Sequence, residues 1–305
     1  MSITVSCMKY TFRIILLLFL ITSCEESNEN PVLNTIQNND ENDEQIIVEA
    51  IIDETDLIIL PEDTGGIHQA YPLGSTATEF GHYVYTPGGY TNDGPEYPLI
   101  IFLHGWGAQG DSRNDEKILD IILYHGLPSL IKMGQWNPKF PFIVVSPQLV
   151  TEYWPANKIH SFIEYLIENY QINTDRIYLT GLSLGGGGCW YYVGQIEDNY
   201  AAAILPISAS GNENLIENLR KIPIWAFHGA KDELVKAYDN FGSVPMVDAI
   251  NKTNPKVKAK VTVYPLAGHN GWTRTYNGTG MFQGEKRFDQ YDMNIYNWLL
   301  QYKKE

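Results

Sequence analysis

The stretch that decides the fold is residues 176–189, Arg-Ile-Tyr-Leu-Thr-Gly-Leu-Ser-Leu-Gly-Gly-Gly-Gly-Cys. It opens with a short apolar run that favours a β-strand, continues as Gly-Leu-Ser-Leu-Gly at 181–185, and runs into more glycines and aromatics. A serine hydroxyl is a weak nucleophile that must be presented to a base and a substrate together. A sharp strand-to-helix turn lifts it above the sheet, and glycines permit that turn because they lack Cβ. The stretch therefore predicts a strand, a nucleophilic Ser183, and a helix whose free N–H groups face the same place.

A Gly-x-Ser-x-Gly pentapeptide is not decisive by itself, because small residues recur often enough for it to arise by chance. The plain alternative is a glycine-rich turn that only packs a helix closely on a sheet. The rest of the chain has to decide between these two interpretations.

Length and composition favour a single large α/β domain. The chain has 305 residues, of which 44% are hydrophobic, and this is enough to build a substantial core. Its net charge of −15 argues against binding to nucleic acid, since a phosphate backbone attracts basic surfaces. We found no metal-ligand cluster, phosphate loop or dinucleotide fingerprint in the sequence, so we expect no cofactor.

The amino terminus has the pattern of an export signal. Residues 1–23 contain Lys9, Arg13 and an apolar run at 14–21 that is too short to span a membrane. The segment ends in Ile-Thr-Ser-Cys, which resembles a bacterial lipobox with Cys24 as the lipidated residue. Met8 would leave a more compact signal than Met1. An ordinary signal peptide with a chance cysteine remains the alternative.

The residues after Cys24 predict an acidic tether that joins a lipid anchor to the domain. Residues 24–45 are rich in Asn, Glu and Asp, with little apolar content. The Glu-Glu pair at 25–26 resembles the signal that sends Bacteroidota lipoproteins to the cell surface. We therefore expect an exported lipoprotein held at the outer membrane, with a catalytic domain at residues 46–305. Of the three cysteines, Cys189 alone would lie in that domain, which excludes a disulfide within it.

Strand-like and helix-like segments alternate along the domain, and this predicts a mostly parallel sheet with helices on both faces. Residues 46–60 are expected to form a leading strand or a packed arm. The expected strands are 80–86, 99–103, 142–145, 175–180, 201–208, 222–227 and 261–264. The expected helices are 114–124, 128–133, 156–170, 190–196, 244–251 and 294–303.

The remaining parts of a hydrolytic site follow other predicted strands. A tetrahedral intermediate needs two N–H donors for its oxygen. One would be the backbone N–H of Leu184, and the other that of Trp106, in the loop His104-Gly-Trp-Gly that follows residues 99–103. His104 itself is expected to hold this loop by a side-chain hydrogen bond.

The base has to be a histidine, and the chain offers seven. His269 is the best candidate, because it lies in the loop after the last predicted strand and can reach over the turn. The acid that orients it would come one strand earlier, where Asp232 and Glu233 both suit the chemistry. The resulting chain order is Ser, Asp, His.

These residues give the sequence a clear resemblance to α/β-hydrolases. It is most similar to the esterases around the poly(hydroxyalkanoate) depolymerase, feruloyl esterase and predicted-peptidase groups. The matching residues are 104–107, 181–186, His228-Gly-Ala-Lys-Asp232 with Val235, and Gly268-His269. The resemblance covers roughly residues 75–303 and implies that Asp232 is the acid. It also implies ester substrates on plant or algal polysaccharides. The run of four glycines departs from the usual pair and predicts a loose first helical turn.

Aromatic residues could wall a cleft for acetyl or feruloyl-type esters of polysaccharide or oligosaccharide. The candidates are Trp106, Trp154, Trp190 and Trp272, for each of which burial in the core is the equal alternative. Residues 187–222 are too few for a large lid, which favours an open cleft. Two other functions remain: a serine peptidase with the same triad, and a non-catalytic glycan-binding surface lipoprotein.

Overall fold

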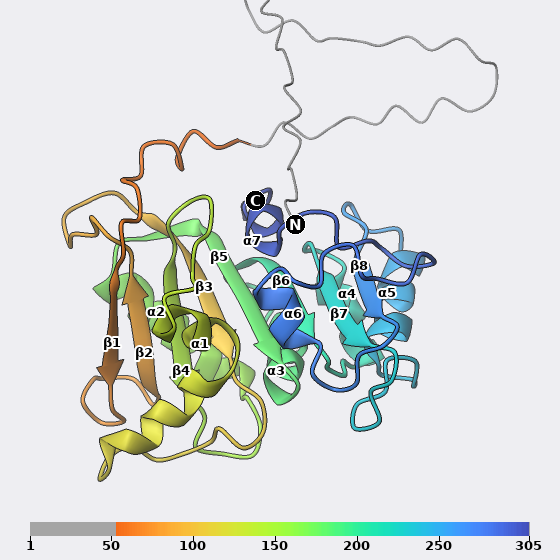
Figure 1. Ribbon diagram of the computed structural model, residues 1–305, viewed down its shortest axis with the longest axis horizontal. Coiled ribbons are helices and arrows are strands. Elements are labelled where there is room, and N and C mark those ends of the chain that lie inside the picture. Colours follow the sequence, from red (N-terminus) through yellow and green to blue (C-terminus); the bar gives the residue numbers. More distant parts are fainter. Residues whose placement is uncertain (1–52, 305) are drawn as a thin grey trace, which may run out of the picture. The chain divides into compact units, whose positions relative to one another are not determined.

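The computed structural model describes residues 53–304 as one eight-stranded sheet flanked by helices (Figure 1). The predicted signal peptide, lipidation site and tether lie outside the described residues. The strand order is β1-β2-β4-β3-β5-β6-β7-β8; β1 and β2 run antiparallel to their neighbours, and the other pairs are parallel. The strands are β1 (Ile67–Tyr71), β2 (Gly81–Thr86), β3 (Tyr97–Leu103), β4 (Ile143–Gln148), β5 (Ile172–Leu182), β6 (Ala201–Ile207), β7 (Trp225–Gly229) and β8 (Lys260–Tyr264).

Helices cover both faces of this sheet, and the alternation of side chains along each strand explains how. In β3, Leu99, Ile101 and Leu103 pack on one face, against α2, α3 and α5. Ile100 and Phe102 point to the opposite face, against α1, α6 and α7. The helical elements are η1 (Glu116–Tyr124), α1 (Gly126–Lys132), α2 (Ala156–Asn169), α3 (Leu184–Gln195), η2 (Glu213–Leu215), α4 (Ile216–Leu219), α5 (Ser243–Lys252), α6 (Trp272–Tyr276) and α7 (Ile295–Leu299).

The predicted fold class is confirmed, while several predicted elements differ in detail. The described part of the predicted leading segment, residues 53–60, forms turns rather than a strand, since its acidic residues interrupt the apolar pattern. The alternative of a packed arm is confirmed for these residues, because Leu57 is buried in the core. Residues 116–124 form a 3₁₀ helix rather than an α-helix, and the carboxyl-terminal helix ends at Leu299. Two elements were not predicted from the sequence: β1, in which apolar and polar residues alternate only weakly, and α6, which is five residues long.

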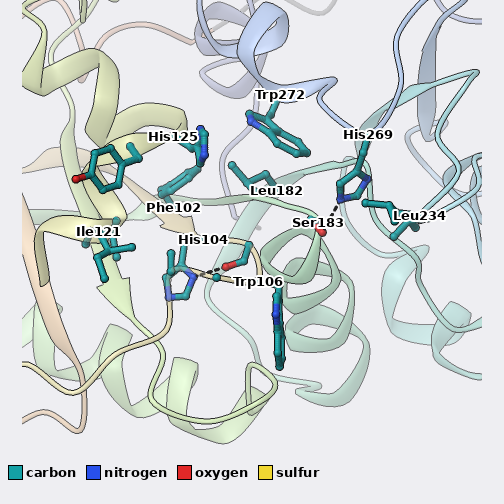
Figure 2. A pocket seen from close by; sticks show the side chains of 16 residues that line it. Phe102, His104, Trp106, Ile121, His125, Leu182, Ser183, Leu234, His269 and Trp272 are labelled. Carbon is teal, nitrogen blue, oxygen red and sulfur yellow. Dashed lines mark hydrogen bonds between the residues drawn. The ribbon is translucent and has the colours of Figure 1, made fainter. Parts of the chain in front are cut away.

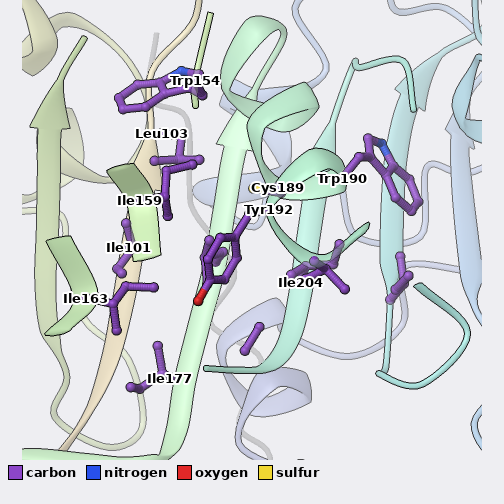
Figure 3. Packing of buried hydrophobic residues seen from close by; sticks show 14 of the residues in the cluster. Ile101, Leu103, Trp154, Ile159, Ile163, Ile177, Cys189, Trp190, Tyr192 and Ile204 are labelled. Atoms are coloured by element: carbon purple, nitrogen blue, oxygen red, sulfur yellow. The ribbon is translucent and has the colours of Figure 1, made fainter. Parts of the chain in front are cut away.

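The helix after the predicted nucleophile is embedded in the larger hydrophobic cluster (Figure 3). Cys189, Trp190 and Tyr192 on α3 are fully buried and pack with strand residues that include Ile101, Ile177 and Ile204. These contacts fix α3 along most of its length. The turn that precedes α3 is therefore supported by the core rather than by its own hydrogen bonds alone.

Strand β5 is also tied to both ends of the described chain. The guanidinium of Arg176, fully buried, bonds the Asp56 carboxylate through Nε at 2.6 Å and the Leu300 carbonyl through Nη1 at 2.7 Å. A buried charge is tolerated only when it is paired and hydrogen-bonded. This ion pair therefore links the first described turn and the end of α7 to the strand that carries the active-site turn.

Candidate active site

Ser183 occupies a one-residue turn between β5 and α3. Its backbone angles are φ 52° and ψ −118°, a conformation that L-residues other than glycine rarely adopt. The Ser183 N–H donates to the Ile207 carbonyl at 2.9 Å, and the Ser183 carbonyl accepts from the Gly187 N–H at 3.0 Å. Strain of this kind persists only where the surroundings hold the residue on both sides, as β6 and α3 do here.

Close backbone approach explains the glycine at position 185. A Cβ atom on Gly185 would lie 1.9 Å from the Leu103 carbonyl oxygen at the end of β3. Gly105 makes a similar approach from the neighbouring loop, where its Cβ would lie 3.4 Å from the Ser183 Cβ and 2.6 Å from the Leu182 side chain. The first turn of α3 and the loop after β3 are thus pressed against the serine from two sides.

The structure brings the three predicted triad residues together at the carboxyl ends of their strands. Figure 2 shows two of them, Ser183 and His269, facing each other. The His269 Nε2 lies 2.8 Å from the Ser183 Oγ, and the His269 Nδ1 lies 2.7 Å from the Asp232 Oδ2. A carboxylate only accepts, so Nδ1 carries the proton and Nε2 is free to accept the serine proton. This is the arrangement that general-base activation of a serine needs.

The Asp232 carboxylate makes three hydrogen bonds. Its Oδ1 accepts from the backbone N–H groups of Leu234 at 3.0 Å and Val235 at 2.9 Å, while Oδ2 faces His269. Burial works to raise the pKa of Asp232, but hydrogen bonds from His228, His269 and Val235 outweigh it and bring the pKa to about 2. Glu233, the sequence alternative, is exposed to solvent. Geometry therefore selects Asp232 between the two acids.

The two predicted oxyanion donors lie on the segments that border Ser183. Leu184 is the first residue of α3, and Trp106 follows Gly105 in the loop after β3. Within residues 53–304, neither backbone N–H donates a hydrogen bond to the protein. Unpaired N–H groups at a helix start and in an adjacent loop suit a developing oxyanion.

A pocket of about 460 Å³ opens beside Ser183 and is walled mainly by apolar and aromatic side chains. In Figure 2, Trp272 and Trp106 lie on opposite sides of the serine, and His269 closes the pocket near Leu234. The other wall consists of Phe102, Ile121, Ile122, Tyr124, His125 and Leu182. The volume is in the range of small-molecule sites, which is about 300–1,000 Å³.

Comparison with known proteins identifies the family of this chain. Residues 90–277 match the model of the Phospholipase/Carboxylesterase family. The chain belongs to the phospholipase/carboxylesterase family. It has the α/β-hydrolase fold.

A curated relative matches half of the chain. The chain is 25% identical, over 161 residues, to a bifunctional acetylxylan esterase/xylanase XynS20E from Neocallimastix patriciarum. That stretch covers 50% of this chain but 21% of the relative, so the chain spans about a fifth of the length of that protein.

Solved structures show the same fold. A thermostable esterase superposes with a TM-score of 0.56 at 22% identity, covering 79% of this chain and 64% of the other. A feruloyl esterase module from Clostridium thermocellum, solved with sinapinate, gives a TM-score of 0.51 at 17% identity, covering 80% and 90%.

Two of the four tryptophans that were predicted to contact substrate do not line the pocket. Trp190 is 0% exposed and belongs to the core beneath α3. Trp154 is 3% exposed and donates from Nε1 to the His104 carbonyl at 3.1 Å. Both side chains face inward because their segments bury that side against the sheet, which spacing along the sequence does not reveal. Trp106 and Trp272 do line the pocket.

The structural role predicted for His104 is confirmed. Its Nδ1–H donates to the Gly105 carbonyl at 2.7 Å, and its Nε2 accepts from the Leu149 N–H at 2.9 Å. Burial, partly offset by the bond to Gly105, lowers the pKa of His104 to about 4, so the ring is neutral at pH 7. His104 thereby fixes the loop that carries Trp106 to the end of β4.

One part of the pocket wall was not predicted from the sequence. It comes from the end of β3 and from η1, which supply Phe102, Ile121, Ile122 and Tyr124. The apolar pattern of η1 was visible, but it predicts burial without saying against what. Within residues 53–304, no group of His, Cys, Asp and Glu side chains could hold a metal ion. In the same range, none of the helices has the length and apolarity needed to cross a bilayer.

Proposed function

We propose that the esterase removes acetyl or feruloyl-type acyl groups from polysaccharide or oligosaccharide, with Ser183 as nucleophile, His269 as base and Asp232 as the orienting acid. The observation that carries the proposal is the hydrogen-bonded chain from Asp232 through His269 to Ser183, at 2.7 and 2.8 Å, at the mouth of an apolar pocket.

In this mechanism His269 Nε2 takes the proton from the Ser183 hydroxyl as Oγ attacks the ester carbonyl. The N–H groups of Leu184 and Trp106 receive the oxygen that becomes negative in the tetrahedral intermediate. The carbon–oxygen bond to the alcohol then breaks, and the alcohol leaves with the proton that His269 held. Water then attacks the acyl carbon while His269 takes its proton; the bond between that carbon and the Ser183 Oγ breaks, the acid is released, and Oγ recovers the proton from His269. The Asp232 carboxylate stabilises the imidazolium in both halves.

Pocket size favours the aromatic acyl group over acetyl. An acetyl group has two carbons and would leave most of the roughly 460 Å³ empty. A planar phenolic acyl chain would contact Phe102, Ile121 and Trp272, whose aromatic and branched faces favour such rings. The named activity of the relative from Neocallimastix supports a carbohydrate ester in general.

The test compares the full-length protein with its Ser183→Ala variant on methyl ferulate, p-nitrophenyl acetate, and feruloylated and acetylated xylan oligosaccharides. We expect Ser183→Ala to lose several orders of magnitude of rate, as loss of a triad member does. Ser146→Ala is the matched control, because Ser146 is buried on β4 outside the pocket. Retained activity in Ser183→Ala would overturn the catalytic assignment.

The substrate proposal has its own outcome in that experiment. A kcat/KM on feruloyl esters above that on acetyl esters supports the aromatic assignment, and the reverse order overturns it. Hydrolysis of peptide substrates with no ester activity would favour the serine peptidase alternative. Binding of the oligosaccharides without turnover by the wild type would favour the glycan-binding alternative.

We also propose that the protein is a lipoprotein held at the outer membrane through Cys24. The support is the lipobox-like sequence at residues 21–24 and the acidic residues that follow. Growth with a labelled fatty acid tests it, with Cys24→Ala compared with Cys189→Ala, which removes the buried cysteine of the domain instead. Label that survives Cys24→Ala would overturn the assignment.

A further inference from the structure

A second histidine lies against the carboxylate of Asp232. His228 is the fourth residue of β7 and is 0% exposed. Its Nε2 lies 3.2 Å from the Asp232 Oδ2, the same oxygen that faces His269, and 2.7 Å from the Val235 carbonyl. This oxygen therefore sits between two imidazoles, one exposed to the pocket and one enclosed in the core.

Geometry fixes where the proton of His228 resides. A carbonyl oxygen can only accept, so the Nε2 that faces the Val235 carbonyl must carry a hydrogen. The Asp232 Oδ2 lies 3.2 Å from the same nitrogen and is the second acceptor beside this N–H. The Nδ1 lies 2.8 Å from the Ser243 Oγ, whose other neighbour is the Ala209 carbonyl at 3.3 Å. The contact with Ser243 holds the ring in this orientation.

We propose that His228 is a positioning residue for the ester hydrolysis, which donates to Asp232 and so fixes the oxygen that orients His269. Asp232 then has a donor at every bonding position: Leu234 and Val235 at Oδ1, and the two histidines at Oδ2. A carboxylate that is held in this way cannot rotate away from the imidazole. It also stays a weaker proton acceptor, so the proton remains on His269 during the reaction.

His228 acts through Asp232 and does not reach the substrate, since it lies outside the pocket wall. The pocket is lined on that side by Leu234, Val235 and His269. The inference rests on the catalytic roles proposed above for Ser183, His269 and Asp232. The ionisable side chains around this carboxylate in the described chain are His228 from β7, His269 from the loop after β8, and the solvent-exposed Lys231 and Glu233 beside it. From α5, the uncharged Ser243 packs against His228.

The test uses three variants of the full-length protein. His228→Leu has a similar volume but no donor, and His228→Gln keeps an N–H. His82→Leu is the matched control, because His82 is also 0% exposed on this sheet but lies on β2, away from the triad. The measurements are kcat and KM from pH 4 to 9 and the melting temperature of each variant.

We expect His228→Leu to lower kcat about 10- to 100-fold with little change in KM, the factor associated with losing a hydrogen bond to a charged group. With one donor fewer, Asp232 stabilises the His269 imidazolium more strongly, so the acid limb of the kcat/KM profile moves upward by about half a pH unit or more. His228→Gln should restore kcat to within about fivefold of wild type. His82→Leu should leave kcat and the limb in place.

Either of two results would overturn the inference. One is a folded His228→Leu enzyme with wild-type kcat and an unmoved acid limb. The other is an equal loss in the Leu and Gln variants without a shift in the limb, which indicates packing alone. If Ser183→Ala keeps its activity, the proposed catalytic roles fail independently of His228.

A second measurement does not depend on whether a variant folds. In wild-type protein labelled with ¹⁵N-histidine, the Nε2 of His228 should carry a proton throughout the pH range in which kcat/KM rises. The His228→Gln spectrum assigns the signal by its disappearance. An unprotonated Nε2 in that range would contradict the shared donation to Val235 and Asp232.

Discussion

Alanine substitutions at Gly185 and Gly187 should distinguish two effects on stability: close packing of α3 against the backbone of β3, and the helix propensity of the substituted residue. Gly185→Ala places a Cβ 1.9 Å from the Leu103 carbonyl oxygen, whereas real Cβ contacts are essentially never below 3.0 Å. Strand β3 or α3 must therefore shift by about 1.1 Å, the difference between these two distances. In Gly187→Ala the nearest atom is the Ser210 carbonyl oxygen at 3.7 Å, an ordinary contact.

The magnitudes follow from these distances. Overpacking against backbone costs about 1–3 kcal/mol or more, and alanine returns about 1 kcal/mol of helix propensity. We expect Gly185→Ala to lose about 2 kcal/mol of unfolding free energy, or about 4–8 °C in Tm for a domain of this size. Gly187→Ala has only the propensity gain and should rise by about 2 °C.

Activity should follow the same division. A displacement of about 1 Å in α3 moves Ser183 away from His269, and misplacement on this scale costs about 100-fold in rate. The assay is the Tm by differential scanning calorimetry together with kcat on p-nitrophenyl acetate for both variants. Wild-type Tm and kcat in Gly185→Ala would refute the close approach of Gly185 to the Leu103 carbonyl. A lower Tm in Gly187→Ala would refute the conclusion that a Cβ fits at position 187.

Three further predictions concern charge and burial. The pKa of the Asp232 carboxyl falls from 3.8 to about 2 on folding. The ionised carboxylate therefore contributes on the order of 2 kcal/mol to the free energy of unfolding above pH 4, and this contribution is lost as the pH falls toward 2. In urea unfolding, Asp232→Asn should be most destabilised at pH 7 and should converge with wild type near pH 2. Asp56→Ala leaves the buried Arg176 guanidinium without its carboxylate, so it should lower the free energy of unfolding in urea by about 3 kcal/mol. Glu54→Ala breaks a solvent-exposed ion pair and should cost less than about 1 kcal/mol. Equal losses in the two variants would contradict a structural role for the Arg176–Asp56 ion pair. Burial raises the pKa of the Cys189 thiol, so mass spectrometry of the native protein after iodoacetamide should find Cys189 unmodified and modified only after unfolding.

Much of the candidate site could be predicted because its residues follow parallel strands directly. Ser183, Asp232 and His269 each come after an apolar strand-like run, and carboxyl ends of parallel strands meet at one edge of a sheet. Their order along the chain then decides the arrangement. Asp232 was preferred to Glu233 by its place in the loop and by the resemblance to α/β-hydrolases. The structure gives the physical reason, since Asp232 bonds His269 and Glu233 faces solvent.

The walls of the pocket could not be predicted in the same way. Trp190 and Trp272 look alike in sequence, since both follow a site residue by a few positions. Trp190 is directed into the core by the rotation of α3, whereas Trp272 begins α6 and faces His269 at a ring distance of 5.2 Å. Helical phase and the position of a short helix depend on packing with distant segments, which no local pattern encodes.

By itself, the sequence determined the α/β fold class and the turn that presents Ser183, because both depend on local hydrophobic period and on glycine. It also determined the order of the site residues along the chain. Only the tertiary structure decided which side chains wall the pocket and that His228 shares the Asp232 oxygen with His269. These contacts join residues far apart in the chain, and their distances follow from how the strands and helices pack as a whole.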